Sequence, residues 1–137
     1  MEIRKYREAD FDGIDALWKE AFPNDPPWNQ AAISIPAKTS FQPDLLFVAV
    51  SDGTVVGSVM AGYDGHRGWL YAVAVGQSHK RSGLGTKLVR RAEEALRLLG
   101  CSKINLQVRS TNTAVVRFYE HLGYHIEDRV SLGRRVE

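Results

Sequence analysis

The chain lacks most of the features that place a protein outside the cytoplasm. It has one cysteine, Cys101, in 137 residues, so no internal disulfide can form. It has no apolar run near the length that crosses a bilayer. Its first ten residues carry both acidic and basic side chains instead of an apolar signal region. These absences predict a cytoplasmic protein with no membrane partner.

A strong charge of one sign is also missing. The chain carries 18 Lys and Arg against 16 Asp and Glu, a net charge of +2, which is too small to favour nucleic acid as a partner. The hydrophobic share of 44% is enough to fill one core, and 137 residues leave no room for a second. We therefore expect one domain over residues 1–137.

Basic residues are nevertheless gathered where an apolar strand runs into a helix. Residues 72–86 read Ala-Val-Ala-Val-Gly-Gln-Ser-His-Lys-Arg-Ser-Gly-Leu-Gly-Thr. Amides at the start of a helix have no intrahelical partner and carry the positive end of the helix dipole. Gly83 and Gly85 lack a Cβ, which lets the backbone turn tightly and an anion approach it. The segment predicts a phosphate-binding turn.

Two common phosphate loops do not fit these residues. The nucleoside-triphosphate loop ends in Gly-Lys-Ser/Thr, but Gly85 is followed by Thr86 and then by Lys87. The dinucleotide loop needs Gly or Ala three residues after Gly85, where Leu88 stands. The remaining pattern is Lys80-x-x-Gly83-x-Gly85.

This pattern resembles the Arg/Gln-x-x-Gly-x-Gly/Ala pyrophosphate motif of the GNAT superfamily, the acetyl-CoA-dependent N-acetyltransferases. A second segment is similar to the family's last helix, because Tyr119 follows Asn112 by seven positions and the helix ends in Leu-Gly-Tyr. The first strand and helix also look like those of the family. The resemblance therefore covers nearly the whole chain and points to a small, single-domain bacterial member.

Hydrophobic periodicity and turn signals predict the order of the elements. Asp10 is expected to cap the first helix, and Asp52-Gly53 is a strong hairpin signal. The expected strands cover residues 2–6, 45–50, 54–63, 69–75, 103–109 and 124–136. The expected helices cover residues 11–22, 30–38, 84–99 and 112–123. This βααβββαβαβ order matches the α/β architecture of the GNAT fold, a mixed sheet with helices on both faces.

The resemblance also implies which residues hold acetyl-CoA. Strands 69–75 and 103–109 are expected to run parallel and to splay apart, so that the main chain of Val73 and Val75 can bond the pantetheine arm. Asn112 caps its helix, bonds the arm, or does both. The predicted cofactor-binding residues are Val73, Val75, Lys80, Arg81, Gly83, Gly85, Thr86 and Asn112, and no metal is expected.

The implied reaction is attack of a neutral amine on the acetyl thioester through a tetrahedral oxyanion. An amine with a pKa of about 10.4 is neutral in only about one molecule in 2,500 at pH 7, so a base is needed. A backbone N–H near Val73 is the expected oxyanion donor. Tyr119 resembles the family's general acid, since its phenol stays protonated at pH 7. Its structural alternative is to pack the last helix onto the sheet.

No motif in the sequence identifies the general base or the acceptor. Many family members have an acidic residue early on the strand before the pyrophosphate turn, where this chain has Leu70, Tyr71 and Ala72. The base is therefore a water chain or a side chain such as His66 or Asp64, which lie in a polar turn that is also ordinary hairpin chemistry. The acceptor is a small-molecule or peptide amine. Four aromatic residues either line its pocket or fill the core: Trp18, Phe22, Trp28 and Phe41.

Two other functions remain open on this evidence. A non-catalytic acyl-CoA-binding regulatory module would keep the donor site without turnover, but binding alone does not require Tyr119. The basic helix could instead bind nucleic acid, but it lacks interleaved exposed aromatic residues. A terminal strand over residues 124–136 could pair across a homodimer.

Overall fold

The fold was analysed in a computed structural model, which describes residues 1–136. The chain divides into two compact units, Met1–Gln107 and a second that begins at Val108. Each unit has its own elements and is treated separately. The expectation of one domain over residues 1–137 stays a prediction.

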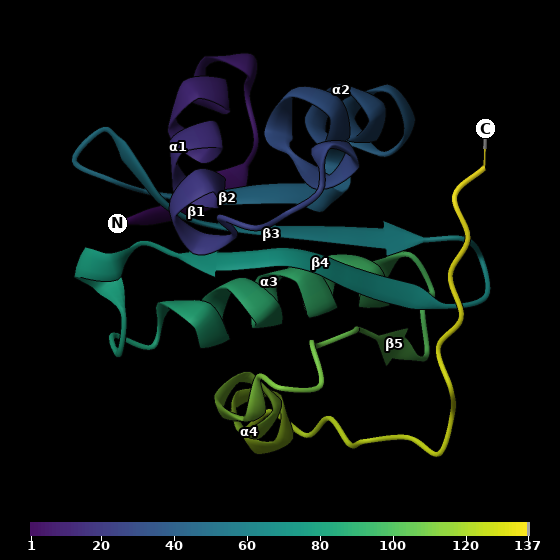
Figure 1. The fold of residues 1–137 in the computed structure, drawn as a ribbon. Coiled ribbons are helices and arrows are strands. Elements are labelled where there is room, and N and C mark those ends of the chain that lie inside the picture. The colour runs from purple at the N-terminus through teal and green to yellow at the C-terminus, as the bar shows by residue number, and fades with distance from the viewer. Residues whose placement is uncertain (137) are drawn as a thin grey trace. The chain divides into compact units, whose positions relative to one another are not determined.

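The first unit is a five-stranded sheet in the order β1-β2-β3-β4-β5. Figure 1 shows α1 and α2 on one face of this sheet and α3 on the other. The first four strands pair antiparallel, and β5 pairs parallel with β4. The strands are β1 (Glu2–Lys5), β2 (Leu46–Ser51), β3 (Thr54–Tyr63), β4 (Gly68–Val75) and β5 (Ile104–Asn105). The helices are α1 (Phe11–Ala21), α2 (Ala31–Phe41) and α3 (Leu84–Leu98), with single 3-10 turns at Glu8–Asp10, Pro27–Asn29, Pro43–Leu45 and Gln77–His79. The predicted α/β class with a mixed sheet is confirmed.

Helix α1 lies where the sequence predicts it and buries the residues that recur at helical spacing. Ile14, Leu17 and Trp18 are at most 5% exposed. Asp10 stands at the predicted N-cap position of α1, but the expected side-chain cap is wrong, because its carboxylate does not bond the amides of α1. Instead it accepts hydrogen bonds from the Arg7 backbone N–H at 2.8 Å and from both terminal nitrogens of Arg4. A guanidinium competes well for a carboxylate, since two parallel charge-assisted bonds form at once.

Helix α2 is longer than the predicted residues 30–38 and contains Pro36. A proline inside a helix removes one backbone hydrogen bond. The carbonyl of Pro36 accepts bonds from the hydroxyls of Thr39 and Ser40. The helix then runs on to Phe41.

The β2–β3 hairpin confirms the sequence prediction almost residue for residue. Its turn residues Asp52 and Gly53 both have positive φ, 51° and 76°. That combination is typical of the tight turn that matches the twist of two paired strands. Leu46–Ala49 are fully buried, so β2 is covered on both faces.

Strand β4 contains a bulge and has a mostly open edge. Ser58 pairs with Ala74 and Met60 with Tyr71, so two residues of β4 face one residue of β3. Ala72, inside this bulge, has φ of +50°. On the other edge β4 pairs with β5 only at Gly68 and Trp69. The predicted strand 103–109 is therefore too long, whereas the parallel and splayed pairing is confirmed.

A buried hydrogen-bonded chain links α1, β3 and the bulge. The indole Nε1 of Trp18 donates to Ser58 Oγ at 2.8 Å, and that hydroxyl donates to the Ala72 carbonyl at 2.8 Å. Ser58 is fully buried and Trp18 is 5% exposed. The bulge removes the Ala72 carbonyl from the regular ladder between β3 and β4. The Ser58 hydroxyl of β3 then serves as its hydrogen-bond donor.

Replacing Ser58 by Ala should destabilise the protein by about 1–3 kcal/mol, because the Trp18 N–H is then buried without an acceptor. Chemical denaturation of wild type and Ser58→Ala measures this difference. The double variant Trp18→Phe, Ser58→Ala should cost less than the sum of the two single changes, since neither partner is left unpaired. Strict additivity would show that the two side chains are not coupled.

The second unit contains α4 (Thr113–His121), close to the predicted range 112–123. Gly123 has φ of +99° and ends it. The predicted strand 124–136 is wrong, since none of residues 124–136 is in a strand. Its apolar side chains Ile126, Val130 and Leu132 are 79–91% exposed. Alternating apolar residues form a strand only when a neighbouring strand pairs with them, and the dimer pairing expected for this strand loses its basis.

No helix within residues 1–136 is both long and apolar enough to cross a membrane.

Candidate active site

The turn before α3 presents free backbone amides. Gly83 has φ of +83° and precedes the first helical residue, and no side chain caps the helix. The first intrahelical acceptor, Gly83 O, is used by Lys87 N at 3.2 Å. The N–H groups of Leu84, Gly85 and Thr86 have no acceptor among residues 1–136. A Cβ at Gly83 would meet no atom within 4 Å, so the turn is open above this glycine.

The cations of this region divide into two groups. Lys80, Arg81 and Lys87 are exposed, and no acidic group in the described chain pairs with them. By contrast, Arg90 pairs with Glu93 at 2.7 Å, and the Arg91 guanidinium lies 4.5 Å from the centre of the Phe47 ring. Only the first group is available to an anion at the turn.

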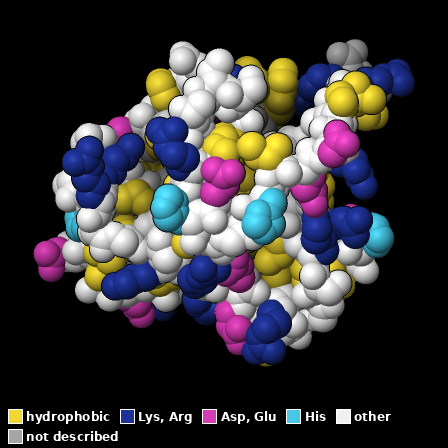
Figure 2. All heavy atoms as spheres, turned by 90° about the horizontal axis from the view of Figure 1, so that it is seen from below, with side chains coloured by type: hydrophobic (Ala, Val, Ile, Leu, Met, Phe, Trp, Pro, Cys, Tyr) yellow, Lys and Arg dark blue, Asp and Glu magenta, His cyan; other side chains and the backbone are white. Residues whose placement is uncertain are grey.

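The wider surface carries no continuous basic band on the face drawn in Figure 2. Lys and Arg side chains occur there in separate groups, with Asp and Glu between them.

The open edge of β4 exposes main-chain groups near this turn. The Gly76 N–H donates to the Val56 carbonyl of β3 at 2.8 Å. Because successive residues of a strand direct their N–H and C=O groups to opposite edges, those of Val75 face away from β3. Beyond Trp69 that edge has no strand partner in the described chain. The edge and the α3 turn together fit a ligand with an extended, amide-containing arm and a phosphate group.

In the second unit, the predicted acid Tyr119 is 8% exposed. It packs edge-on against the rings of Phe118 at 5.0 Å and Tyr124 at 5.6 Å between ring centres. Burial raises the pKa of its phenol to about 12. The Asn112 side chain accepts the Val115 N–H at 3.4 Å, so its predicted capping role is confirmed and its bond to a ligand stays a prediction.

Comparison with known proteins decides the family. The sequence profile described as "Acetyltransferase (GNAT) family" matches residues 11–124. The chain belongs to the acetyltransferase (GNAT) family. It is 44% identical over 137 residues to an acetyltransferase of Sodalis glossinidius, covering 99% of this chain and 96% of the relative. It is also 40% identical over 136 residues to an acetyltransferase of Yersinia pestis (strain Pestoides F), with the same coverage.

The fold is that of GNAT acetyltransferases. The structure of AAC(6')-Iy in complex with the bisubstrate analogue CoA-S-monomethyl-acetylneamine superimposes with a TM-score of 0.77 at 21% identity, covering 98% of this chain and 97% of that one. Family membership and fold together make this chain an N-acetyltransferase.

The two side chains predicted as candidate bases of this GNAT protein lie in the β3–β4 turn. Asp64 Oδ1 accepts the backbone N–H groups of His66 and Arg67, both at 2.7 Å. These bonds lower the pKa of the Asp64 carboxyl, which makes it a weak base. His66 is exposed. The turn thus has the hairpin chemistry that was the alternative interpretation.

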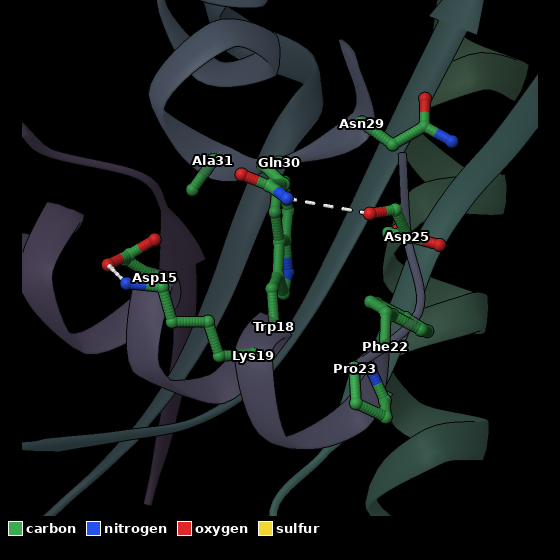
Figure 3. A pocket seen from close by; sticks show the side chains of 9 residues that line it. All are labelled: Asp15, Trp18, Lys19, Phe22, Pro23, Asp25, Asn29, Gln30 and Ala31. Carbon is green, nitrogen blue, oxygen red and sulfur yellow. Dashed lines mark hydrogen bonds and ion pairs between the residues drawn. The ribbon is translucent and has the colours of Figure 1, made fainter. Parts of the chain in front are cut away.

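The predicted acceptor aromatics of the GNAT chain separate into two pairs. Figure 3 shows Trp18 and Phe22 at a pocket between the end of α1 and the start of α2, of ≈ 190 Å³. This volume is below the range of about 300–1,000 Å³ that drug-sized ligands occupy, so it suits only a small group. Trp28 and Phe41 do not line this pocket and are 45% and 76% exposed.

Sequence patterns do not indicate Ser58, which bonds the bulge of β4, or Lys38, which lies beside Gly62 of β3. Each is a single polar residue in an otherwise apolar segment, with no motif around it. Only the paired strands bring Ser58 to Ala72, and only the packing of α2 on the sheet brings Lys38 to Gly62.

Proposed function

We propose that this N-acetyltransferase transfers an acetyl group from acetyl-CoA to a primary amine of a small molecule or a peptide. The donor's pyrophosphate would bind the free amides of Leu84, Gly85 and Thr86, with Lys80 and Arg81 supplying charge. The observation that carries this proposal is the uncapped, cation-flanked start of α3 beside an open strand edge. Backbone amides at a helix N-terminus form a site for phosphate.

The pantetheine arm would pair with the main chain of Val73 and Val75 along the open edge of β4, in the manner of an added strand. The bulge supports this arrangement, because it removes Ala72 and Val73 from the regular ladder with β3. An N–H freed near Val73 would then stabilise the oxyanion, a contribution of about 3 kcal/mol in a dry site. Asn112 would add a side-chain bond to the arm.

Tyr119 would donate a hydrogen bond to the departing sulfur. With a pKa of about 12 its phenol is a weaker acid than a thiol, whose reference pKa is about 8.5. Tyr119 would therefore stabilise the thiolate through a hydrogen bond and would not transfer its proton completely. We further propose that the protein works in the cytoplasm, where acetyl-CoA is made available by metabolism.

Titration of acetyl-CoA into the protein by calorimetry tests the donor site. Gly83→Glu places a negative side chain at the turn and should weaken binding at least tenfold, a difference of about 1.4 kcal/mol. Gly53→Glu is the matched control. Gly53 also has positive φ, +76°, and open space around its Cβ position, but it lies in the β2–β3 turn. Equal loss of binding in both variants, or no binding by folded wild type, would contradict the proposed site.

Release of CoA thiol in the presence of amine probes tests the transfer itself, because binding of the donor without turnover would give the same calorimetric result.

A further inference from the structure

Lys38 is an unusual lysine because its amine lies over the sheet instead of in solvent. It is half-buried on α2, and its Nζ donates to Gln42 Oε1 at 3.0 Å. A Cβ placed on Gly62 of β3 would lie 3.6 Å from Tyr71 Cε2, 3.7 Å from Lys38 Nζ and 3.8 Å from Gln42 Oε1. These distances place the Lys38 amine, the Tyr71 ring and the Gln42 oxygen together beside Gly62.

Gln42 fixes the environment of this amine. Its Nε2 donates to the Tyr63 carbonyl at 2.8 Å, and its Oε1 accepts the Tyr63 N–H at 3.3 Å. Since both ends of the amide are engaged with the backbone, the oxygen stays directed to Lys38. Lys38 is therefore held by a neutral acceptor and not by a carboxylate.

No charged group in the described chain forms an ion pair with Lys38. Asp15 of α1 pairs with Lys19. Asp64, beyond the end of β3, accepts the backbone N–H of His66 in its own turn. The other charged or titratable groups on elements packed against α2 and around Gly62 are Asp12 and Glu20 of α1, Asp44 before β2, Tyr63 of β3 and Tyr71 of β4. Burial without a counter-charge lowers the pKa of the Lys38 amine to about 8.

The amine also lies beside Gly62 and the Tyr71 ring, just before the part of β4 along which the donor is expected to bind. Gly62 pairs with Trp69 and Met60 with Tyr71, and directly opposite residues point to the same face of a sheet. Tyr71 comes immediately before the bulge at Ala72, where the β4 edge is open. The Trp69 and Tyr71 rings, stacked at 6.5 Å, form an apolar wall next to this place.

We propose that Lys38 is the general base of the acetyl transfer, an inference that rests on the function proposed above. Unprotonated Lys38 Nζ takes one proton from the acceptor ammonium, directly or through one water. The freed nitrogen lone pair forms the C–N bond to the acetyl carbon. The C–S bond breaks, its electron pair leaves with sulfur, and the second nitrogen proton passes to the thiolate or to solvent. Lys38 ends as an ammonium and returns its proton to water.

Three variants test this role with acetyl-CoA and three amine probes: a peptide that begins with alanine, a peptide with an internal lysine, and neamine. Lys38→Met should lower kcat/KM by at least about 100-fold, the usual contribution of a general base. Lys38→Arg should be equally slow, because a guanidinium keeps the charge but does not lose its proton. Lys5→Met, an exposed lysine of β1 that pairs with Asp44, should match wild type.

The pH profile separates a base from a packing residue. Wild-type kcat/KM should rise as the pH passes through about 8, where Lys38 loses its proton, and this limb should vanish in Lys38→Met. Gln42→Glu places a carboxylate next to the amine, which favours the ammonium form and should move the limb to higher pH. Wild-type rates in Lys38→Arg, or an unmoved limb in Gln42→Glu, would overturn the proposal for Lys38 alone.

A second measurement does not depend on turnover. The rate at which acetic anhydride labels Lys38, followed by peptide mass spectrometry against pH, should titrate near 8. Ordinary titration of Lys38 would refute the proposal whatever the acceptor. If wild type releases no thiol with any probe, acetyl transfer to these amines fails, and the role of Lys38 fails with it.

Discussion

Replacing Tyr119 by Phe is expected to lower kcat about 100-fold, with a smaller effect on the binding of acetyl-CoA. The change removes one hydroxyl and keeps the ring that packs against Phe118 and Tyr124. Proton donors in enzyme sites contribute about 10²–10⁴ in rate. The lower end applies here, because a buried phenol with a pKa of about 12 gives only partial proton transfer to a thiolate. Steady-state thiol release at saturating acetyl-CoA measures the effect.

Tyr124→Phe, which removes the same hydroxyl group, is the control. The ring centre of Tyr124 lies 5.6 Å from that of Tyr119. Tyr124→Phe should retain most of the wild-type kcat. Since the phenol of Tyr119 ionises only at about 12, it should add no alkaline limb to the wild-type profile below pH 10. A Tyr119→Phe variant with wild-type kcat would leave Tyr119 as a packing residue, which was its alternative interpretation.

The second large effect concerns stability. Asp10→Asn should lower the free energy of unfolding by about 3 kcal/mol at pH 7, because breaking this buried ion pair leaves Arg4 with only the exposed Glu2, 3.6 Å from its Nε, as an acidic partner within residues 1–136. Asp10 is 7% exposed, and its two carboxylate oxygens accept bonds from Arg4 at 2.8 and 2.9 Å. Urea denaturation of the two proteins measures the difference.

The pH dependence of this difference has a definite sign. The bond to Arg4 lowers the pKa of Asp10 in the folded protein, whereas an unfolded chain has the ordinary value of about 3.9. The stabilisation is therefore complete above about pH 5 and is lost as the pH falls through the folded-state pKa. Wild type and Asp10→Asn should approach each other as the pH falls below about 5.

The exposed pair of Lys5 and Asp44, 3.3 Å apart, provides the contrast. Asp44 is 79% exposed in this pair, so Asp44→Asn should change stability by no more than about 0.5 kcal/mol. If both aspartate variants cost the same, burial does not decide the strength of these ion pairs.

Sequence reasoning succeeded where the signal is local. The Asp52-Gly53 turn depends on two residues that tolerate positive φ, and the start of α3 on a glycine before an amphipathic run. The open turn and the helix after Asn112 followed from patterns within a few residues of each other, whereas the parallel pairing of β4 and β5 was expected from the family resemblance.

The rest depends on contacts between distant segments, which one sequence does not reveal. Asp10 resembled a helix cap, but Arg4 on β1 takes its carboxylate. Residues 124–136 alternate like a strand, but no strand pairs with them. Lys38 has no motif, and its low pKa comes from burial over Gly62, a residue 24 positions away. Its position could not be predicted from periodicity.

The open edge of β4 would make the stability of the fold depend on the concentration of the donor. Beyond Trp69, the main chain on this edge has no strand partner within residues 1–136, so water must satisfy groups that a ligand would satisfy better. A ligand that binds only the native state raises the free energy of unfolding by RT ln(1 + [L]/Kd), about 2.7 kcal/mol at 100 times Kd. A donor seated on this edge would therefore lengthen the lifetime of the protein against proteolysis whenever its cellular concentration rises.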